Sequence, residues 1–143
     1  MEVLVEQESG FRFAATCRGH TVTTGQGEDG DEDRDGMWPA QLFEAALGMC
    51  IGGYVAQLCQ ERGIAYEGMT IELSRRIEAG PPDPKTGARP SLTKRIDASI
   101  RLGAELSPQQ EAEILAAADS CHITRSIENG LEIACSLERA ADR

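Results

Sequence analysis

Two cysteines, Cys50 and Cys121, are the residues of this chain whose type and surroundings point to a reaction. Cys50 lies in the middle of a long apolar segment, and Cys121 lies at the end of the next helical segment. Because two helices that cover one sheet pack near each other, the two thiols are expected to be neighbours. In such a pair the first thiolate attacks a peroxide and becomes a sulfenic acid, and the second thiol condenses with it to a disulfide. The alternative interpretation of Cys50 is a buried structural cysteine that takes no part in a reaction.

Residues 37–63, which position Cys50, are predicted to form one long helix. Pro39 suits the first helical position, and Gly63 suits the residue just past the end. Apolar side chains nearly surround this helix, which predicts that it is buried at the centre of the fold. Each glycine in the interior of the helix lowers its stability by about 1 kcal/mol relative to Ala, a loss that is tolerable where another backbone must pack closely. They are Gly48, Gly52 and Gly53.

The composition narrows the class of protein before any fold is considered. The chain has 143 residues, of which 41% are hydrophobic and 4% aromatic, and this suits one domain, residues 1–143, with an aliphatic core. Its net charge of -10 argues against nucleic acid and anionic membranes as partners. No segment approaches the roughly 20 apolar residues of a membrane span, and the first residues lack a signal-peptide pattern, so we expect a cytoplasmic protein. In that compartment the cysteines are expected to be thiols.

The remaining segments predict an α+β fold with an antiparallel sheet. Alternation of apolar and polar side chains, clearest over residues 92–102, indicates strands with one wet face. The predicted strands are residues 3–5, 11–17, 21–24, 69–79, 92–102 and 131–137. A second helix is predicted to begin at Ser107, and residues 121–127 are predicted to form a short third helix. The connecting loops are the acidic residues 25–36 and the proline-rich residues 80–90.

Two motifs in this order resemble the OsmC/Ohr family, the osmotically inducible and organic-hydroperoxide-resistance proteins. The first motif consists of Pro39, Leu42, Phe43, Ala45, Ala46 and Cys50. The second motif consists of Ala117, Ala118, Cys121, Ile123 and Arg125. The resemblance covers residues 11–137 and includes the order of strands, helices and loops.

The resemblance implies an antiparallel sheet wrapped around a long central helix and a second helix, in an intertwined homodimer. It implies that Cys50 is the peroxidatic thiol and Cys121 the resolving thiol of a peroxidase in the oxidative stress response. The substrate would be a small organic hydroperoxide, the electrons would come from a dithiol reductant, and neither a cofactor nor a metal would be needed. The apolar helix independently favours a homodimer, because one small sheet cannot cover it.

The chain departs from the peroxidase branches of the family in the groups that activate the thiol. Those branches usually carry Glu just after the proline, where this chain has Ala40 and Gln41, so Glu44 is the candidate substitute. Burial raises a thiol pKa, and the middle of a helix is too far from its end for the macrodipole to lower it. A cation is therefore expected beside Cys50. The candidates by position are Arg12, Arg18, Arg34 and Arg125.

These departures keep a second function open, that of an OsmC-like protein without peroxidase activity that is redox-responsive or binds an apolar small molecule. Aromatic side chains on or near the long helix are candidates for the wall of a pocket, although Phe43 and Tyr54 are expected to lie in the core. The candidates are Trp38, Phe43 and Tyr54.

Metal sites are disfavoured by spacing. The alternating acids of residues 31–36 imitate the start of an EF-hand loop, but Leu42 stands where that loop needs a bidentate Glu. A second candidate set of metal ligands consists of Cys50, Cys121 and His122. The sequence has no C-x-x-C spacing to support a metal site there. We therefore expect no metal.

Overall fold

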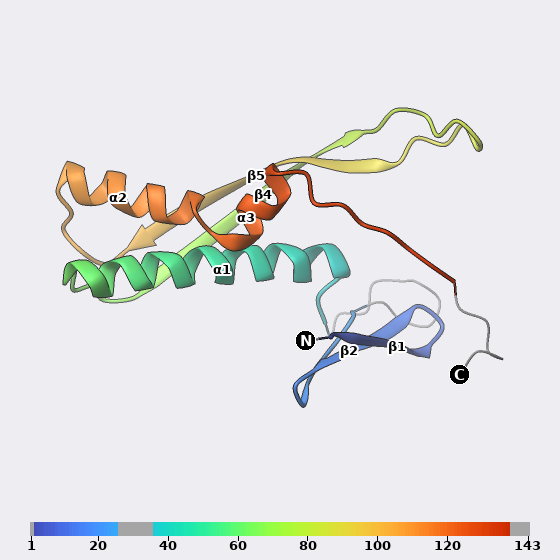
Figure 1. The fold of residues 1–143 in the computed structure, drawn as a ribbon, viewed down its shortest axis with the longest axis horizontal. Coiled ribbons are helices and arrows are strands. Elements are labelled where there is room, and N and C mark those ends of the chain that lie inside the picture. The colour runs from blue at the N-terminus through green and yellow to red at the C-terminus, as the bar shows by residue number, and fades with distance from the viewer. Residues whose placement is uncertain (1, 26–35, 138–143) are drawn as a thin grey trace. The chain divides into compact units, whose positions relative to one another are not determined.

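The structure is a computed structural model that describes residues 2–25 and 36–137. These residues form three helices and two sheets, which confirms the predicted α+β class (Figure 1). The chain divides into two compact units, Met1–Met49 with Glu72–Ser99 and Cys50–Ile71 with Ile100–Arg143. The elements in chain order are β1 (Leu4–Ser9), β2 (Arg12–Cys17), β3 (His20–Thr23), α1 (Pro39–Arg62), β4 (Met69–Ala79), β5 (Ser91–Leu102), α2 (Pro108–Asp119) and α3 (His122–Glu128).

The first three strands form the sheet β1-β2-β3 within the first unit. β1 and β2 are antiparallel with Val5 opposite Ala15, and β2 and β3 are antiparallel with Ala15 opposite Val22. The turn between β2 and β3 has positive φ angles of 52° at Arg18 and 80° at Gly19. Two successive residues with positive φ are typical of a type I′ hairpin. The predicted N-terminal strands are therefore confirmed, with shifted ends.

The long helix α1 is confirmed, and side chains and glycine define its two ends. The Gln41 side chain accepts a hydrogen bond from the Trp38 N–H at 2.9 Å, next to the expected proline at the first helical position. Gly63 follows the last helical residue with a φ of 66°, and the Ile64 N–H donates to the Cys59 carbonyl at 2.9 Å. This bond and the left-handed glycine are those of a Schellman motif, which satisfies carbonyls at the helix end.

One face of α1 is buried within the chain. Its buried side chains recur at helical spacing and are Leu47, Ile51, Val55 and Cys59. In the first unit, a Cβ at Gly48 would lie 2.7 Å from the Leu73 Cδ1 atom of β4. In the second unit, a Cβ at Gly52 would lie 3.2 Å from the Ile71 Cδ1 atom. These two glycines therefore allow the side chains of β4 to pack against the helix, as the sequence suggested for a close approach.

The opposite face of α1 is apolar and exposed in the single chain. Met49 is 76% exposed, and a Cβ built at Gly53 would meet no described atom within 4 Å apart from the backbone of α1 itself. Phe43 and Tyr54 are exposed as well, so the prediction that they lie in the core of the chain is wrong. By length and composition alone, α1 is able to cross a membrane, which the sequence analysis did not anticipate, but the central helix of a soluble protein passes the same test.

β4 and β5 form the second sheet, a two-stranded hairpin. The chain just beyond β5 closes against the segment before β4 in the second unit. The Glu67 N–H donates to the Gly103 carbonyl at 2.8 Å, and the Gly103 N–H donates to the Gly68 carbonyl at 3.1 Å. A Cβ at residue 103 would overlap the Glu67 carbonyl oxygen, so this closure requires glycine.

Replacing this glycine is expected to destabilise the fold. Gly103→Ala should lower the free energy of unfolding by about 1–3 kcal/mol, because the added methyl group meets backbone that cannot rotate away. Gly48→Ala is the matched comparison, since its methyl group would meet only the end of the Leu73 side chain, and the gain in helix propensity offsets part of the overlap. Urea unfolding of both variants measures the difference. Equal loss in the two variants would contradict the assignment of Gly103 to a backbone contact.

α2 starts with the capping box that the sequence predicts. The Ser107 hydroxyl accepts from the Gln110 N–H at 3.2 Å, and the Gln110 side chain accepts from the Ser107 N–H at 2.9 Å. Within the second unit α2 lies beside the C-terminal half of α1 (Figure 1), where Arg62 and Glu113 form an ion pair at 3.2 Å. The short helix α3 follows α2 almost directly.

The predicted strand at residues 131–137 is wrong. Gly130 turns the chain with a φ of 75°, as expected, but the segment that follows pairs with no strand in the described part of the chain. Its apolar side chains are largely exposed, with Leu137 at 95%. A strand forms only where a neighbour accepts and donates its backbone hydrogen bonds, and an alternating pattern does not supply that neighbour.

Candidate functional site

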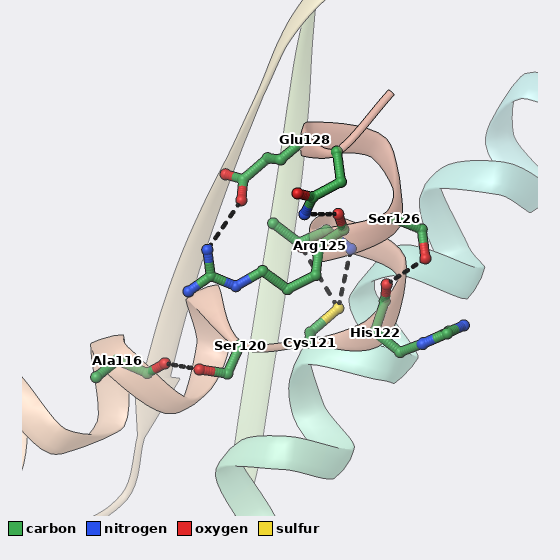
Figure 2. A network of polar contacts seen from close by, with 9 residues as sticks. Ala116, Ser120, Cys121, His122, Arg125, Ser126 and Glu128 are labelled. Atoms are coloured by element: carbon green, nitrogen blue, oxygen red, sulfur yellow. Dashed lines mark hydrogen bonds and ion pairs between the residues drawn. The ribbon is translucent and has the colours of Figure 1, made fainter. Parts of the chain in front are cut away.

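The Cys121 side chain lies at the junction of α2 and α3 in the second unit and is completely buried. Cys121 is the N-cap residue of α3, a position usually held by Ser, Thr, Asp or Asn. Its sulfur accepts hydrogen bonds from the Thr124 backbone N–H at 3.5 Å and from the Thr124 hydroxyl at 3.4 Å (Figure 2). The start of α3 therefore directs two donors of one residue at this sulfur.

Cys50 of α1 lies close enough to Cys121 to contribute to the lowered pKa of the Cys121 thiol. The two residues belong to the same unit, and both are free thiols. Cys50 is only part-buried, whereas the side chain of Cys121 is 0% exposed. The structure therefore brings together the two thiols that the sequence singles out, and Cys50 is the more accessible of the two.

Hydrogen bonds set the acidity of the buried thiol. Burial raises the pKa of Cys121, but the hydroxyl and the N–H of Thr124 lower it. The thiol of Cys50 and the N–H of Ile123 lower it further, so that the pKa of Cys121 lies below its ordinary value. At Cys59, which lacks such donors, burial raises the pKa. Donors directed at the sulfur therefore outweigh the cost of burying the thiolate.

The charged groups next to Cys121 on α3 are turned to other partners. The guanidinium of Arg125 forms an ion pair with Glu128 at 3.3 Å. The His122 imidazole points away from the sulfur (Figure 2). Asp119 at the end of α2 is exposed. No Arg or Lys among the described residues contributes to the lowered pKa of Cys121. The cation expected beside the other thiol, Cys50, stays a prediction.

Two of the other arginine candidates, Arg12 and Arg18, belong to the first unit. Arg12 forms an ion pair with Glu8 at 3.2 Å within the β1-β2-β3 sheet, and Arg18 is exposed in the turn before β3. Both belong to the first unit, whereas Cys50 belongs to the second. Arg34 lies outside the described residues.

Glu44, the candidate substitute for the family glutamate, has a partner that the sequence analysis did not anticipate. Its carboxylate lies 3.0 Å from the guanidinium of Arg75 on β4, within the first unit. Both side chains are partly exposed, at 20% for Glu44 and 30% for Arg75. The pair therefore ties α1 to β4, and Gln41, one of the two residues after Pro39, caps α1 through Trp38.

The described residues offer no metal centre: no group of three His, Cys, Asp or Glu side chains gathers in them. Cys50, Cys121 and His122 are thus not assembled as three ligands. The acidic residues 31–35 of the EF-hand-like segment lie outside the described part of the chain. Of the pocket candidates, Trp38 and Phe43 are exposed in the first unit and Tyr54 in the second, with exposed fractions of 38%, 47% and 38%.

Thr124 is the residue of the site that the sequence analysis missed. A signal for it exists, because residues three apart at the start of a helix form the N-cap hydrogen bond, and Cys121 and Thr124 have that spacing. The signal is weak, since cysteine seldom takes the N-cap position. Arg75 carries no comparable signal, because its partner on α1 is distant in sequence.

The architecture and the thiol pair together define a mixed α+β protein with a free thiol on its long helix and a second thiol beside it. A family model described as OsmC-like protein matches residues 29–136, and the chain belongs to this family. The resemblance stated from the sequence motifs is thereby confirmed. Among curated proteins, none matches the chain.

Solved structures share the fold at low sequence identity. An OsmC-like protein from Mycoplasma pneumoniae is 11% identical with a TM-score of 0.70, covering 91% of this chain and 87% of that chain. A protein of osmotic stress and detoxification response from Psychrobacter arcticus 273-4 is 17% identical with a TM-score of 0.70, covering 87% and 85%. The organic hydroperoxide resistance protein OhrB of Bacillus subtilis is 16% identical with a TM-score of 0.59, covering 90% of each chain. These likenesses establish the fold.

Proposed function

We propose that this chain is a thiol-dependent peroxidase that reduces small organic hydroperoxides, with Cys50 as the peroxidatic thiol and Cys121 as the resolving thiol. The observation that carries the proposal is the meeting of a part-buried thiol on α1 with a buried thiol whose sulfur is surrounded by donors. A thiol that forms sulfenic acid needs a second thiol within reach to form a disulfide. The shared fold with an organic hydroperoxide resistance protein supports the same chemistry.

The second candidate function is that of an OsmC-like protein without peroxidase activity, which responds to redox state or binds an apolar small molecule. Two features favour it. Neither Ala40 nor Gln41 supplies a carboxylate after Pro39, and the Gln41 side chain is used as a helix cap. Glu44, the nearest acid on α1, is paired with Arg75.

A peroxide-consumption assay separates the two functions. With a dithiol such as dithiothreitol as reductant, the protein should consume tert-butyl hydroperoxide faster than hydrogen peroxide, because apolar surroundings of the thiol favour an organic substrate. Cys50→Ser protein measured beside it gives the background of the reductant alone. Absence of turnover with both peroxides would reject the peroxidase and leave the second candidate.

We further propose that the protein acts as a cytoplasmic homodimer that uses a dithiol reductant and needs no cofactor. The exposed apolar face of α1 supports a protein partner for this helix. The net charge of -10 favours neither nucleic acid nor an anionic membrane as that partner.

A further inference from the structure

The chain has a single asparagine, Asn129, which stands directly before a glycine, Gly130. Both residues are exposed, and they form the turn at the C-terminal end of α3. Gly130 has a φ of 75°, a conformation that favours a residue without a Cβ. An asparagine side chain is most open to attack by the next backbone nitrogen when the next residue is glycine, because no side chain then shields that nitrogen.

We propose that Asn129 is a site of spontaneous deamidation and that the last turn of α3 holds this reaction back in the folded protein. In the reaction, a hydroxide ion from water removes the proton of the Gly130 N–H, and the nitrogen attacks the Cγ atom of Asn129. The new N–C bond forms, the bond from Cγ to the side-chain nitrogen breaks, and that nitrogen takes a proton from water and leaves as ammonia. Water then opens the succinimide ring to aspartate or isoaspartate, and no atom is oxidised or reduced.

Hydrogen bonds at the end of α3 engage both reacting groups in the folded chain. The Gly130 N–H donates to the Ile127 carbonyl at 3.1 Å, so the proton that must leave is already shared. The side-chain Nδ2 of Asn129 donates to the Arg125 carbonyl at 2.7 Å, which holds the side-chain amide against the helix end. The reaction therefore requires the last turn of α3 to open. Helix ends open more readily than the whole fold unfolds, so the folded protein should react slowly but measurably.

The product would weaken the helix end at which it forms. A carboxylate at residue 129 cannot donate to the Arg125 carbonyl, and it adds negative charge to the C-terminal end of α3, where the helix macrodipole is already negative. The guanidinium of Arg125 is already paired with Glu128 (Figure 2). Asn129→Asp should therefore have a lower melting temperature than the unchanged protein, and an equal melting temperature would contradict this consequence.

Mass spectrometry of the reduced full chain, kept in mildly alkaline buffer, tests the proposal. The tryptic peptide of residues 126–139 contains Asn129 and no glutamine, so deamidation is measured as a gain of about one mass unit in that peptide. The gain should appear in the unchanged protein and should be absent over the same time in Asn129→Gln, whose longer side chain does not close the succinimide ring. In urea the rate should rise at least about tenfold, because the two hydrogen bonds are then lost. No gain in urea, or equal rates with and without urea, would overturn the proposal.

Ile127→Gly isolates the contribution of the helix, because glycine weakens the last turn of α3 and the Ile127 side chain is 45% exposed, so that little packing is lost. Without urea, this variant should deamidate about threefold faster than the unchanged protein. Ile133→Gly is the matched control, since it makes the same change in the same tryptic peptide, beyond the end of α3, at a side chain that is 82% exposed. It should react at the unchanged rate. An unaltered rate in Ile127→Gly, or an equal rise in both variants, would show that α3 does not restrain the reaction.

Discussion

Cys50→Ser is expected to abolish hydroperoxide turnover, and Cys121→Ser is expected to stop the reaction after its first oxidation. Serine at position 50 leaves no sulfur to take up the peroxide oxygen, so consumption should fall to the background rate. Serine at position 121 removes the thiol that forms the disulfide, so Cys50 should accumulate as sulfenic acid, which a dimedone-type reagent traps and mass spectrometry locates.

The control variants for this experiment are Cys17→Ser and Cys135→Ser, which remove thiols outside the proposed pair. Cys17 lies on β2 in the first unit, and Cys135 is exposed in the segment after α3. Both variants should keep full turnover, and mild oxidation of either should still yield a disulfide between residues 50 and 121. Turnover that survives Cys50→Ser, or a trapped sulfenic acid at another cysteine, would contradict the assigned roles.

The parts of the fold that the sequence predicts correctly are those fixed by local chemistry. Ser107 and Gln110 satisfy each other's backbone groups at the start of α2, and Gly63 adopts the positive φ that ends α1. Such signals act over a few residues and need no knowledge of the remaining chain. The roles assigned to Cys50 and Cys121 stay predictions, although both residues lie in one unit and Cys50 contributes to the lowered pKa of Cys121.

The features that the sequence does not predict depend on partners that no local pattern specifies. Residues 131–137 alternate like a strand, but no described neighbour in the chain pairs with them. Phe43 and Tyr54 have core chemistry, yet they are exposed because α1 presents two apolar faces and the chain covers one. The donors of Thr124 were missed because a cysteine replaces the usual oxygen acceptor at the start of α3.

Placing a charge on the exposed face of α1 is expected to prevent dimerisation. Met49 is 76% exposed in the single chain, and a homodimer that buries this face would bury a carboxylate in Met49→Glu. In a two-fold interface the same substitution acts from both chains. Each lost methionine contact costs about 2 kcal/mol of the free energy of association, and each desolvated charge costs more. The dissociation constant of the dimer should therefore rise by at least about a thousandfold.

Light scattering at micromolar concentration measures the result, with twice the chain mass expected for the unchanged protein and the mass of a single chain for Met49→Glu. Gln109→Glu is the matched control, since it adds the same charge to an exposed position in the first turn of α2, and it should remain dimeric. The acidic side chain also suits the start of a helix, which offsets part of the loss of the hydrogen bond that Gln109 donates to Glu113 at 3.2 Å, so the loss of stability should be small. A folded monomer of the unchanged chain, or a Met49→Glu protein that stays dimeric, would show that the apolar face of α1 has another partner.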